Sequence, residues 1–153
     1  MAKGNAQIDE LDRAIIEQLQ TDGRMPYTRL GSAVGMSEAA VRQRVQRLID
    51  LGVMQVVAVT DPLSLGMRRV AMIGVKTEGD VRRVAELMGS LDEVSYLVVT
   101  AGSFDVMAEV VVEDDEALLT LINDKIRAIP GVRRTETFVY LRLAKQTYQW
   151  GAR

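Results

Sequence analysis

Residues 36–52 combine an apolar stripe with polar side chains on the opposite side, a pattern that predicts one short helix. Apolar or small residues recur at spacings of three and four: Val41, Val45, Leu48 and Gly52. Ser37 suits the N-cap of this helix, and Gly52 suits the left-handed conformation that ends one. The residues near 180° from the stripe are small, amide-bearing or charged: Ala39, Gln43, Gln46, Arg47 and Asp50. Such a face suits hydrogen bonding to base edges and phosphates in a major groove, although an ordinary amphipathic surface helix has the same pattern.

Charge is distributed unevenly around this helix. Residues 1–60 hold seven Lys/Arg and seven Asp/Glu, so this half of the chain is neutral as a whole. Its arginines nevertheless cluster in residues 24–47, with Glu38 as an acid among them: Arg24, Arg29, Arg42, Arg44 and Arg47. A neutral domain with one basic face is compatible with DNA binding. Arg44 lies on the flank of the apolar stripe, so we expect it to pair internally with an acid such as Asp12.

The composition argues against several kinds of chemistry. The chain has 153 residues, of which 48% are hydrophobic and 26% charged, with a net charge of −2. It has no cysteine and no histidine, which removes thiolate nucleophiles, disulfides and the commonest proton shuttle and metal ligand. We find no Ser/His/Asp set, no metal cluster, no leader and no membrane-spanning apolar run, so the expectation is a cytoplasmic protein without a cofactor.

Two helices precede the one described above. Residues 8–20 carry apolar residues at helical spacing, and Asp22-Gly23 ends that pattern. Pro26 suits the start of a second helix over Tyr27 to Val34, which Gly35 terminates. Three helices with a tight turn between the last two predict a helix-turn-helix. The β-branched segment Val53 to Val59 predicts a strand or wing after it.

The second half of the sequence alternates between strand and helix patterns. A linker is expected over residues 61–68, between a first domain of residues 1–60 and a second of 69–153. The expected elements are strands over 69–76, 94–100, 104–113 and 132–143, with helices over 79–91 and 114–129. This βαββαβ order is that of the ferredoxin-like fold. The fold class is therefore α+β: an N-terminal winged helix-turn-helix followed by a ferredoxin-like domain.

Alternation within the strands predicts two different sheet faces. Val106, Ala108, Val110 and Val112 form one apolar side of their strand, which should lie under the helices. The other strands place further apolar residues on one face or the other: Met72, Tyr96, Val98, Phe138 or Tyr140. With both helices on one side, the second face would leave apolar area in water. Monomers rarely expose so much apolar surface, so we expect a partner subunit to cover it.

Four motifs together resemble the Lrp/AsnC (feast/famine) transcription regulators. They are the opening Ile8-Asp9-Glu10-Leu11-Asp12, the run from Ser37 to Met54, the loop Thr100-Ala101-Gly102-Ser103-Phe104-Asp105, and the turn Pro130-Gly131-Val132. They occur in order along nearly the whole chain. The resemblance implies a sequence-specific DNA-binding regulator that dimerises through its sheet, with dimers assembling further, to octamers or open arrays. It also implies that the effector, usually an amino acid, binds at the contact between dimers.

The helix over residues 36–52 supplies the expected DNA-contacting set: Ser37, Ala39, Arg42, Gln43, Gln46 and Arg47. Arg47, on the outward face, is expected to read a base, and Arg42, on the flank, to meet phosphate. The resemblance assigns the effector site. The effector site includes Thr100, Ala101, Gly102, Ser103 and Asp105, together with Thr135 and Thr137 on the last strand. Glycine allows backbone amides to approach a carboxylate, and Asp105 suits an α-ammonium. A plain hairpin turn would explain the same loop.

Two other functions fit parts of the sequence. Sirohaem decarboxylases resemble this two-domain architecture, so fold alone does not separate a regulator from an enzyme. The absence of histidine disfavours that chemistry. A stand-alone amino-acid sensor is disfavoured because residues 8–59 would then have no role. A DNA-binding regulator that responds to a small effector is the function that the sequence favours.

Overall fold

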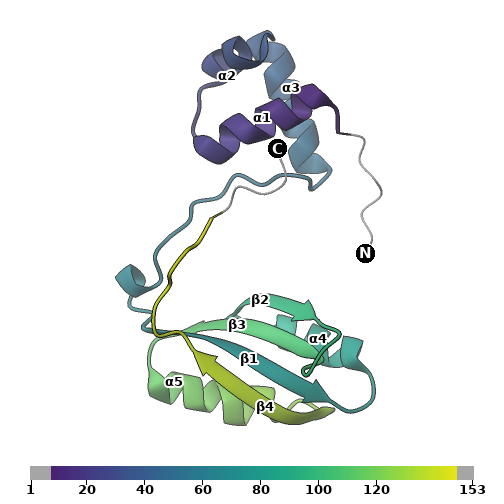
Figure 1. Ribbon diagram of the computed structural model, residues 1–153, viewed down its shortest axis with the longest axis vertical. Helices are drawn as coiled ribbons and strands as arrows, with labels where there is room; N and C mark the ends of the chain where they lie inside the picture. Colours follow the sequence, from purple (N-terminus) through teal and green to yellow (C-terminus); the bar gives the residue numbers. More distant parts are fainter. Residues whose placement is uncertain (1–7, 148–153) are drawn as a thin grey trace. The chain divides into compact units, whose positions relative to one another are not determined.

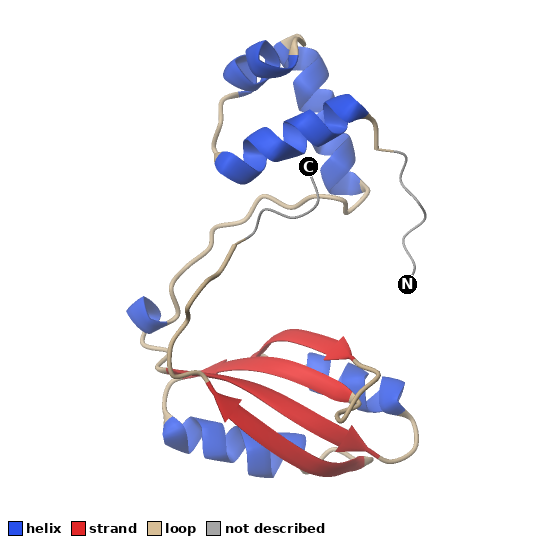
Figure 2. Cartoon of the chain, in the orientation of Figure 1, coloured by secondary structure: helices blue, strands red, loops and turns tan. Residues whose placement is uncertain are grey.

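A computed structural model describes residues 8–147 of the chain, which divide into two compact units. Of the described residues, one unit comprises 8–59 together with 145–147, and the other comprises Thr60–Ala144. Figures 1 and 2 show the first as helical and the second as a sheet with helices. None of the helices in residues 8–147 is long and apolar enough to cross a membrane.

The first unit is a three-helix domain. Its helices are α1 (Glu10–Thr21), α2 (Tyr27–Val34) and α3 (Glu38–Asp50), which agree with the sequence prediction to within two residues. Asp9 caps α1 in a reciprocal capping box with Asp12, and the Ser37 side chain accepts from the Ala40 amide at the start of α3. The core is built from all three helices and the turn before α2: Ile15, Leu19, Met25, Leu30, Val41, Val45 and Leu48.

The turn between α2 and α3 depends on two glycines. Gly35 has a φ of 71°, a left-handed conformation that side chains disfavour, and it ends α2. A Cβ added to Gly31 would lie 2.6 Å from the carbonyl oxygen of Met36, so the absence of a side chain lets the turn fold back onto α2. The Met36 amide donates to the Gly31 carbonyl at 2.8 Å, which fixes this close approach. The predicted helix-turn-helix is confirmed.

The strand predicted over Val53–Val59 is wrong. These residues are loop (Figure 2). The side chains of Val56, Val57 and Val59 are more than half exposed. β-branched residues favour a pleated, half-buried surface, but a strand also needs a neighbour to complete its backbone hydrogen bonds. No strand pairs with this segment within residues 8–147, so no wing is formed there.

The second unit has the predicted βαββαβ order after a short 3₁₀ turn at Leu63–Leu65. Its elements are β1 (Arg69–Thr77), α4 (Val81–Gly89), β2 (Val94–Val99), β3 (Val106–Val112), α5 (Asp115–Thr120) and β4 (Val132–Val139). A π-helical segment, Leu121–Ile126, continues α5. The strands form one antiparallel sheet in the order β2-β3-β1-β4, which is the ferredoxin-like arrangement (Figure 1). The last strand ends at Val139 rather than at residue 143.

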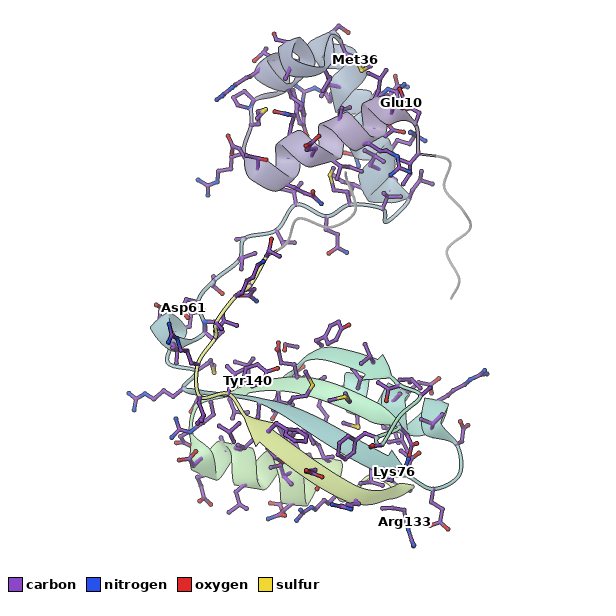
Figure 3. All side chains as sticks on the ribbon, in the orientation of Figure 1. Glu10, Met36, Asp61, Lys76, Arg133 and Tyr140 are labelled. Atoms are coloured by element: carbon purple, nitrogen blue, oxygen red, sulfur yellow. The ribbon has the colours of Figure 1, made fainter. Side chains whose placement is uncertain are left out.

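The helices cover one face of this sheet (Figure 1). The core under them contains the predicted apolar side of β3 together with alternate residues of β1, namely Ala71, Ile73 and Val75. The opposite face, called the open face below, carries the side chains that alternate with these. Tyr96 and Phe138 on it are 57% and 44% exposed, and Tyr140 is also exposed (Figure 3). The predicted two-faced sheet is therefore present in the single chain.

Candidate functional sites

The outward face of α3 is exposed and continuous. It lines a shallow depression with residues from the middle and end of the helix: Ala39, Arg42, Gln43, Gln46, Arg47, Asp50 and Leu51. All the residues predicted to contact DNA are exposed, because the opposite stripe of α3 is the one that packs on α1 and α2. A helix positioned in this way presents guanidinium and amide groups to a ligand outside the domain, and no part of the domain has to unfold for these groups to be reached.

Two side chains on this face are held by neighbouring residues. Arg42 donates to Glu38 at 2.8 Å and lies 5.0 Å from the centre of the Tyr27 ring, so both α2 and α3 hold it. Gln46 donates to Asp50 at 2.8 Å, one turn further along. Both pairs are exposed and readily exchanged for a ligand, because exposed pairs contribute little to stability.

A network of charged residues lies behind this face. Asp12 is completely buried and accepts from Arg44 Nη1 at 2.8 Å and from Arg47 Nη2. Arg44 Nη1 also lies 2.7 Å from Asp9 Oδ2. The predicted internal pair of Arg44 with Asp12 is confirmed. Arg47 keeps the outward position that the helical pattern predicted and stays 43% exposed, but its guanidinium also reaches back to Asp12 of α1, a contact that the sequence did not reveal.

Both carboxylates in this network are ionised at neutral pH. Burial alone would raise the pKa of Asp12, but hydrogen bonds from Arg47 and Arg44 outweigh it and hold that pKa below its ordinary value. The backbone amide of Asp12 and the guanidinium of Arg44 likewise lower the pKa of Asp9. A group whose folded-state pKa is depressed stabilises the fold above its unfolded pKa, so this contribution is lost only as the pH falls below about 4.

The loop between β2 and β3 is a closed turn. The Thr100 hydroxyl donates to the Phe104 carbonyl at 2.5 Å, and the Thr100 amide donates to the Asp105 carbonyl at 2.9 Å. The Phe104 ring packs directly over Gly74 of β1, where an added Cβ would lie 2.6 Å from the ring. Ala101, Gly102 and Ser103 between these anchors are all exposed. The loop is therefore held at both ends and open in the middle.

Asp105 has partners that the sequence did not reveal. Its carboxylate accepts from Lys76 Nζ at 2.9 Å and from the Thr77 amide at 2.8 Å, both at the end of β1. The hydrogen bond from the Thr77 amide, together with the Lys76 ammonium, lowers the pKa of Asp105. Lys76 (Figure 3) and its carboxylate partner remain partly exposed, so the pair offers both signs of charge next to the loop. Alternation along β1 gave no signal for this contact between residues 29 positions apart.

Thr135 and Thr137, on β4, lie on a different face of the sheet from the loop of residues 100–105. They pair with Val75 and Ile73, whose side chains are buried under the helices. Directly paired residues point to the same side of a sheet, so both threonines belong to the helix-covered face. Thr135 accepts from Arg127 Nε at 2.9 Å on that side. One subunit therefore does not bring these threonines together with Asp105.

Among residues 8–147, no group of His, Cys, Asp or Glu is arranged to hold a metal ion.

Two family models match the chain. Residues 8–49 match the AsnC-type helix-turn-helix domain, and residues 67–153 match an AsnC-type C-terminal dimeric alpha+beta barrel domain. The chain belongs to the Lrp/AsnC family of transcription regulators. An uncharacterised helix-turn-helix-type transcriptional regulator of Pyrococcus abyssi is 38% identical over 93% of this chain and 91% of its own. The predicted resemblance is thus confirmed, and the family decides in favour of a regulator over an enzyme.

Solved structures agree with this assignment. The leucine response regulatory protein of Mycobacterium tuberculosis has a TM-score of 0.84 and 27% identity, and the match covers 92% of this chain and 97% of that one. A Neisseria meningitidis transcriptional regulator in complex with L-Met has a TM-score of 0.81, with 92% of this chain and 94% of that one covered. Its 23% identity shows the shared fold alone.

Proposed function

We propose that this Lrp/AsnC protein binds specific DNA sequences through the outward face of α3 and that a small, amino-acid-like effector modulates this binding. The observation that carries the DNA-binding part is the exposed face of α3, with its arginines and amides, on a helix whose opposite stripe is buried in the core of the domain. In a helix-turn-helix, the second helix of the motif enters the major groove.

The chemistry of each residue indicates its role. Glutamine pairs well with adenine edges, so Gln43 and Gln46 are the proposed base readers. Ser37, the N-cap of α3, and Ala39, in its first turn, are small enough to allow close approach of the sugar-phosphate backbone to the helix N-terminus. Arg42 lies on the flank over Tyr27 and is the proposed phosphate contact. Arg47 is the proposed donor to a base edge.

The Arg42→Ala substitution tests this interface. After selection of an operator from a random library, we expect the variant to bind more weakly across all sequences. The salt slope should fall by about one unit for each phosphate that the missing arginine no longer neutralises. Gel shifts between 50 and 200 mM salt measure this slope. Arg83→Ala, an exposed arginine of α4, serves as the control and should match the wild type. An unchanged slope in Arg42→Ala would remove that residue from the interface.

For the effector, we propose a site at the loop of residues 100–105 on the open face of the sheet. A zwitterionic amino acid needs an acceptor for its ammonium and donors for its carboxylate. Asp105 is ionised, and the exposed amides of Gly102 and Ser103 are suitable donors, with Lys76 as a further cation. Thr135 and Thr137, on the other face, would join the site only from another subunit. Assembly beyond the dimer, as in an octamer, is part of this proposal.

The Asp105→Asn substitution tests the effector site. A thermal-shift screen against amino acids and related amines first identifies a ligand. At a concentration of a hundred times its dissociation constant, such a ligand adds about 2.7 kcal/mol to the free energy of unfolding. We expect Asp105→Asn to weaken the binding of that ligand by about 1.5–3 kcal/mol, the range for a hydrogen bond to a charged group. Asparagine is preferable to alanine, because alanine would leave the Thr77 amide and Lys76 without their partner.

Calorimetry on the two proteins measures this difference directly. Asp124→Asn, an exposed carboxylate on the helix-covered side, is the matched control and should bind the ligand like the wild type. Equal affinities for wild type and Asp105→Asn would mean that Asp105 serves only to close the turn.

A further inference from the structure

Asp12 is the one buried charged residue in the part of the chain that the structure describes. It belongs to α1, which does not contribute to the proposed DNA-binding face. Both of its carboxylate oxygens are nevertheless occupied by arginines of α3: Oδ1 by Arg44 and Oδ2 by Arg47. A fully buried carboxylate is costly unless it is paired, so its presence in a small apolar core calls for a reason.

Asp12 is itself held rigidly. The Asp9 amide donates to its Oδ2 at 3.2 Å, and the Asp12 amide donates to Asp9 Oδ1 at 2.8 Å. Arg44 donates to Asp9 as well, which closes the network on the other side. Both carboxylates at the start of α1 thus keep a fixed position relative to α3.

The consequence for Arg47 is a fixed guanidinium. Its Nη2 is bound to Asp12, whereas its Nε and Nη1 donate to no group within residues 8–147, and its side chain lines the depression on the outward face. An arginine on an exposed helix is otherwise a flexible cation that binds any nearby phosphate. A planar guanidinium fixed at one edge can instead donate from its other groups in one direction only.

We propose that Asp12 is a positioning residue for DNA recognition, which orients Arg47 as a directed hydrogen-bond donor and offsets its charge. This inference rests on the proposed function of the α3 face. Asp12 lowers the attraction of Arg47 for phosphates in general, and the preference of the protein for its operator over other DNA increases as a result. Arg44, only partly exposed, completes the charge balance of two arginines against two aspartates.

The test compares Asp12→Asn with the wild type on a random-sequence 30-base-pair duplex, by fluorescence anisotropy across a salt series. Asparagine keeps the shape and removes the charge. We expect tighter binding to this duplex and a salt slope steeper by about 0.9 per recognition helix, because Arg47 becomes free to bind phosphate. Preference for the selected operator should fall about tenfold, within the range for one bidentate base contact. An equal or shallower slope overturns the proposal.

Asp9→Asn is the matched control. It removes a charge from the same network and keeps a side chain that caps helices well, but Asp9 contacts Arg44 and not Arg47. Its salt slope on the random duplex should equal that of the wild type. A steeper slope in both variants would mean that net charge alone, rather than the position of Arg47, sets the effect, and this would also overturn the proposal.

Arg47→Ala provides a second test, which does not require the Asp12→Asn variant to fold. The proposal predicts a slope on the random duplex within about 0.3 of wild type, together with about tenfold weaker binding to the operator. A slope shallower by a full unit, or an unchanged operator affinity, contradicts it. Arg42→Ala and Arg47→Ala together report on the proposed function, because failure of both variants to change DNA binding would reject the α3 interface itself, whereas an unchanged Arg42→Ala alone removes only that residue from it.

Discussion

Replacing Leu48 with alanine is expected to unfold the helix-turn-helix domain and abolish DNA binding, while the sheet domain stays folded. Leu48 is completely buried and packs among side chains from all three helices. Removing a buried leucine side chain costs about 2–5 kcal/mol. A domain of about fifty residues has a total stability of roughly 3–8 kcal/mol, so the loss is comparable with the whole. Circular dichroism of the helices and gel shifts with the selected operator measure the two consequences.

Leu11→Ala is the control for this experiment. Leu11 lies on α1 in the same domain but is 39% exposed, so its removal should cost much less than that of Leu48. Because Leu48 and the sheet belong to different compact units, Leu48→Ala should leave the oligomeric state unchanged. A single cooperative transition in which Leu48→Ala also dissolves the assembly would show that the two units do not fold independently.

The regular elements could be predicted from the sequence because each has a local signal. The apolar stripe of α3 and its Ser37 cap lie within one segment, and the alternation in β3 is uninterrupted. The segment Val53–Val59 shows the limit of this reasoning. Its β-branched residues favour a strand as strongly as β3 does, but a strand is completed by its neighbour, which no local pattern supplies.

The sequence allowed prediction of which residues belong to the candidate sites, but not of which groups their side chains contact. The outward face of α3 follows from helical periodicity, and the pairing of Arg44 with Asp12 follows from its position on the flank. Arg47 lies three residues further along the same helix, and its length lets it reach the same carboxylate from an outward position. Periodicity gives the direction of Cβ and not the end of a long side chain.

The same limit applies to Asp105. Its place after a glycine-containing loop is visible in the sequence, whereas its bonds to Lys76 and Thr77 depend on β1 lying beside β3. The separation of Thr135 and Thr137 from Asp105 likewise depends on strand register, since a shift by one residue would reverse the face that they occupy.

The last prediction concerns the open face of the sheet. We expect Phe138→Arg to convert the dimer to a monomer. Phe138 is 44% exposed in the single chain, stacks edge-on against Phe104 with centroids 6.1 Å apart, and pairs with Met72 on the neighbouring strand. The matching C-terminal domain model is a dimeric one, and the open face is the side of the sheet that the helices leave uncovered. Our proposal is that a second copy covers it.

An arginine at position 138 would place an unpaired charge in that interface. Leaving a buried charge without a partner costs about 3–5 kcal/mol, which corresponds to a dimer dissociation constant at least about a hundredfold larger. This face already holds one polar pair, because the Tyr140 hydroxyl donates to Glu109 at 2.9 Å. Burial together with that carboxylate raises the pKa of Tyr140 to about 12. A new guanidinium would find Glu109 already engaged.

Leu119→Arg is the matched control, because Leu119 is 51% exposed on α5 and therefore lies on the helix-covered side of the sheet domain. Sedimentation velocity at micromolar concentration should show a monomer for Phe138→Arg and the wild-type assembly for Leu119→Arg, with both sheet domains folded by circular dichroism. The reverse result would place the dimer contact on the helices. It would also require another explanation for the exposed aromatic residues of β2 and β4, because a charged substitution of one of them would then have left the subunits together.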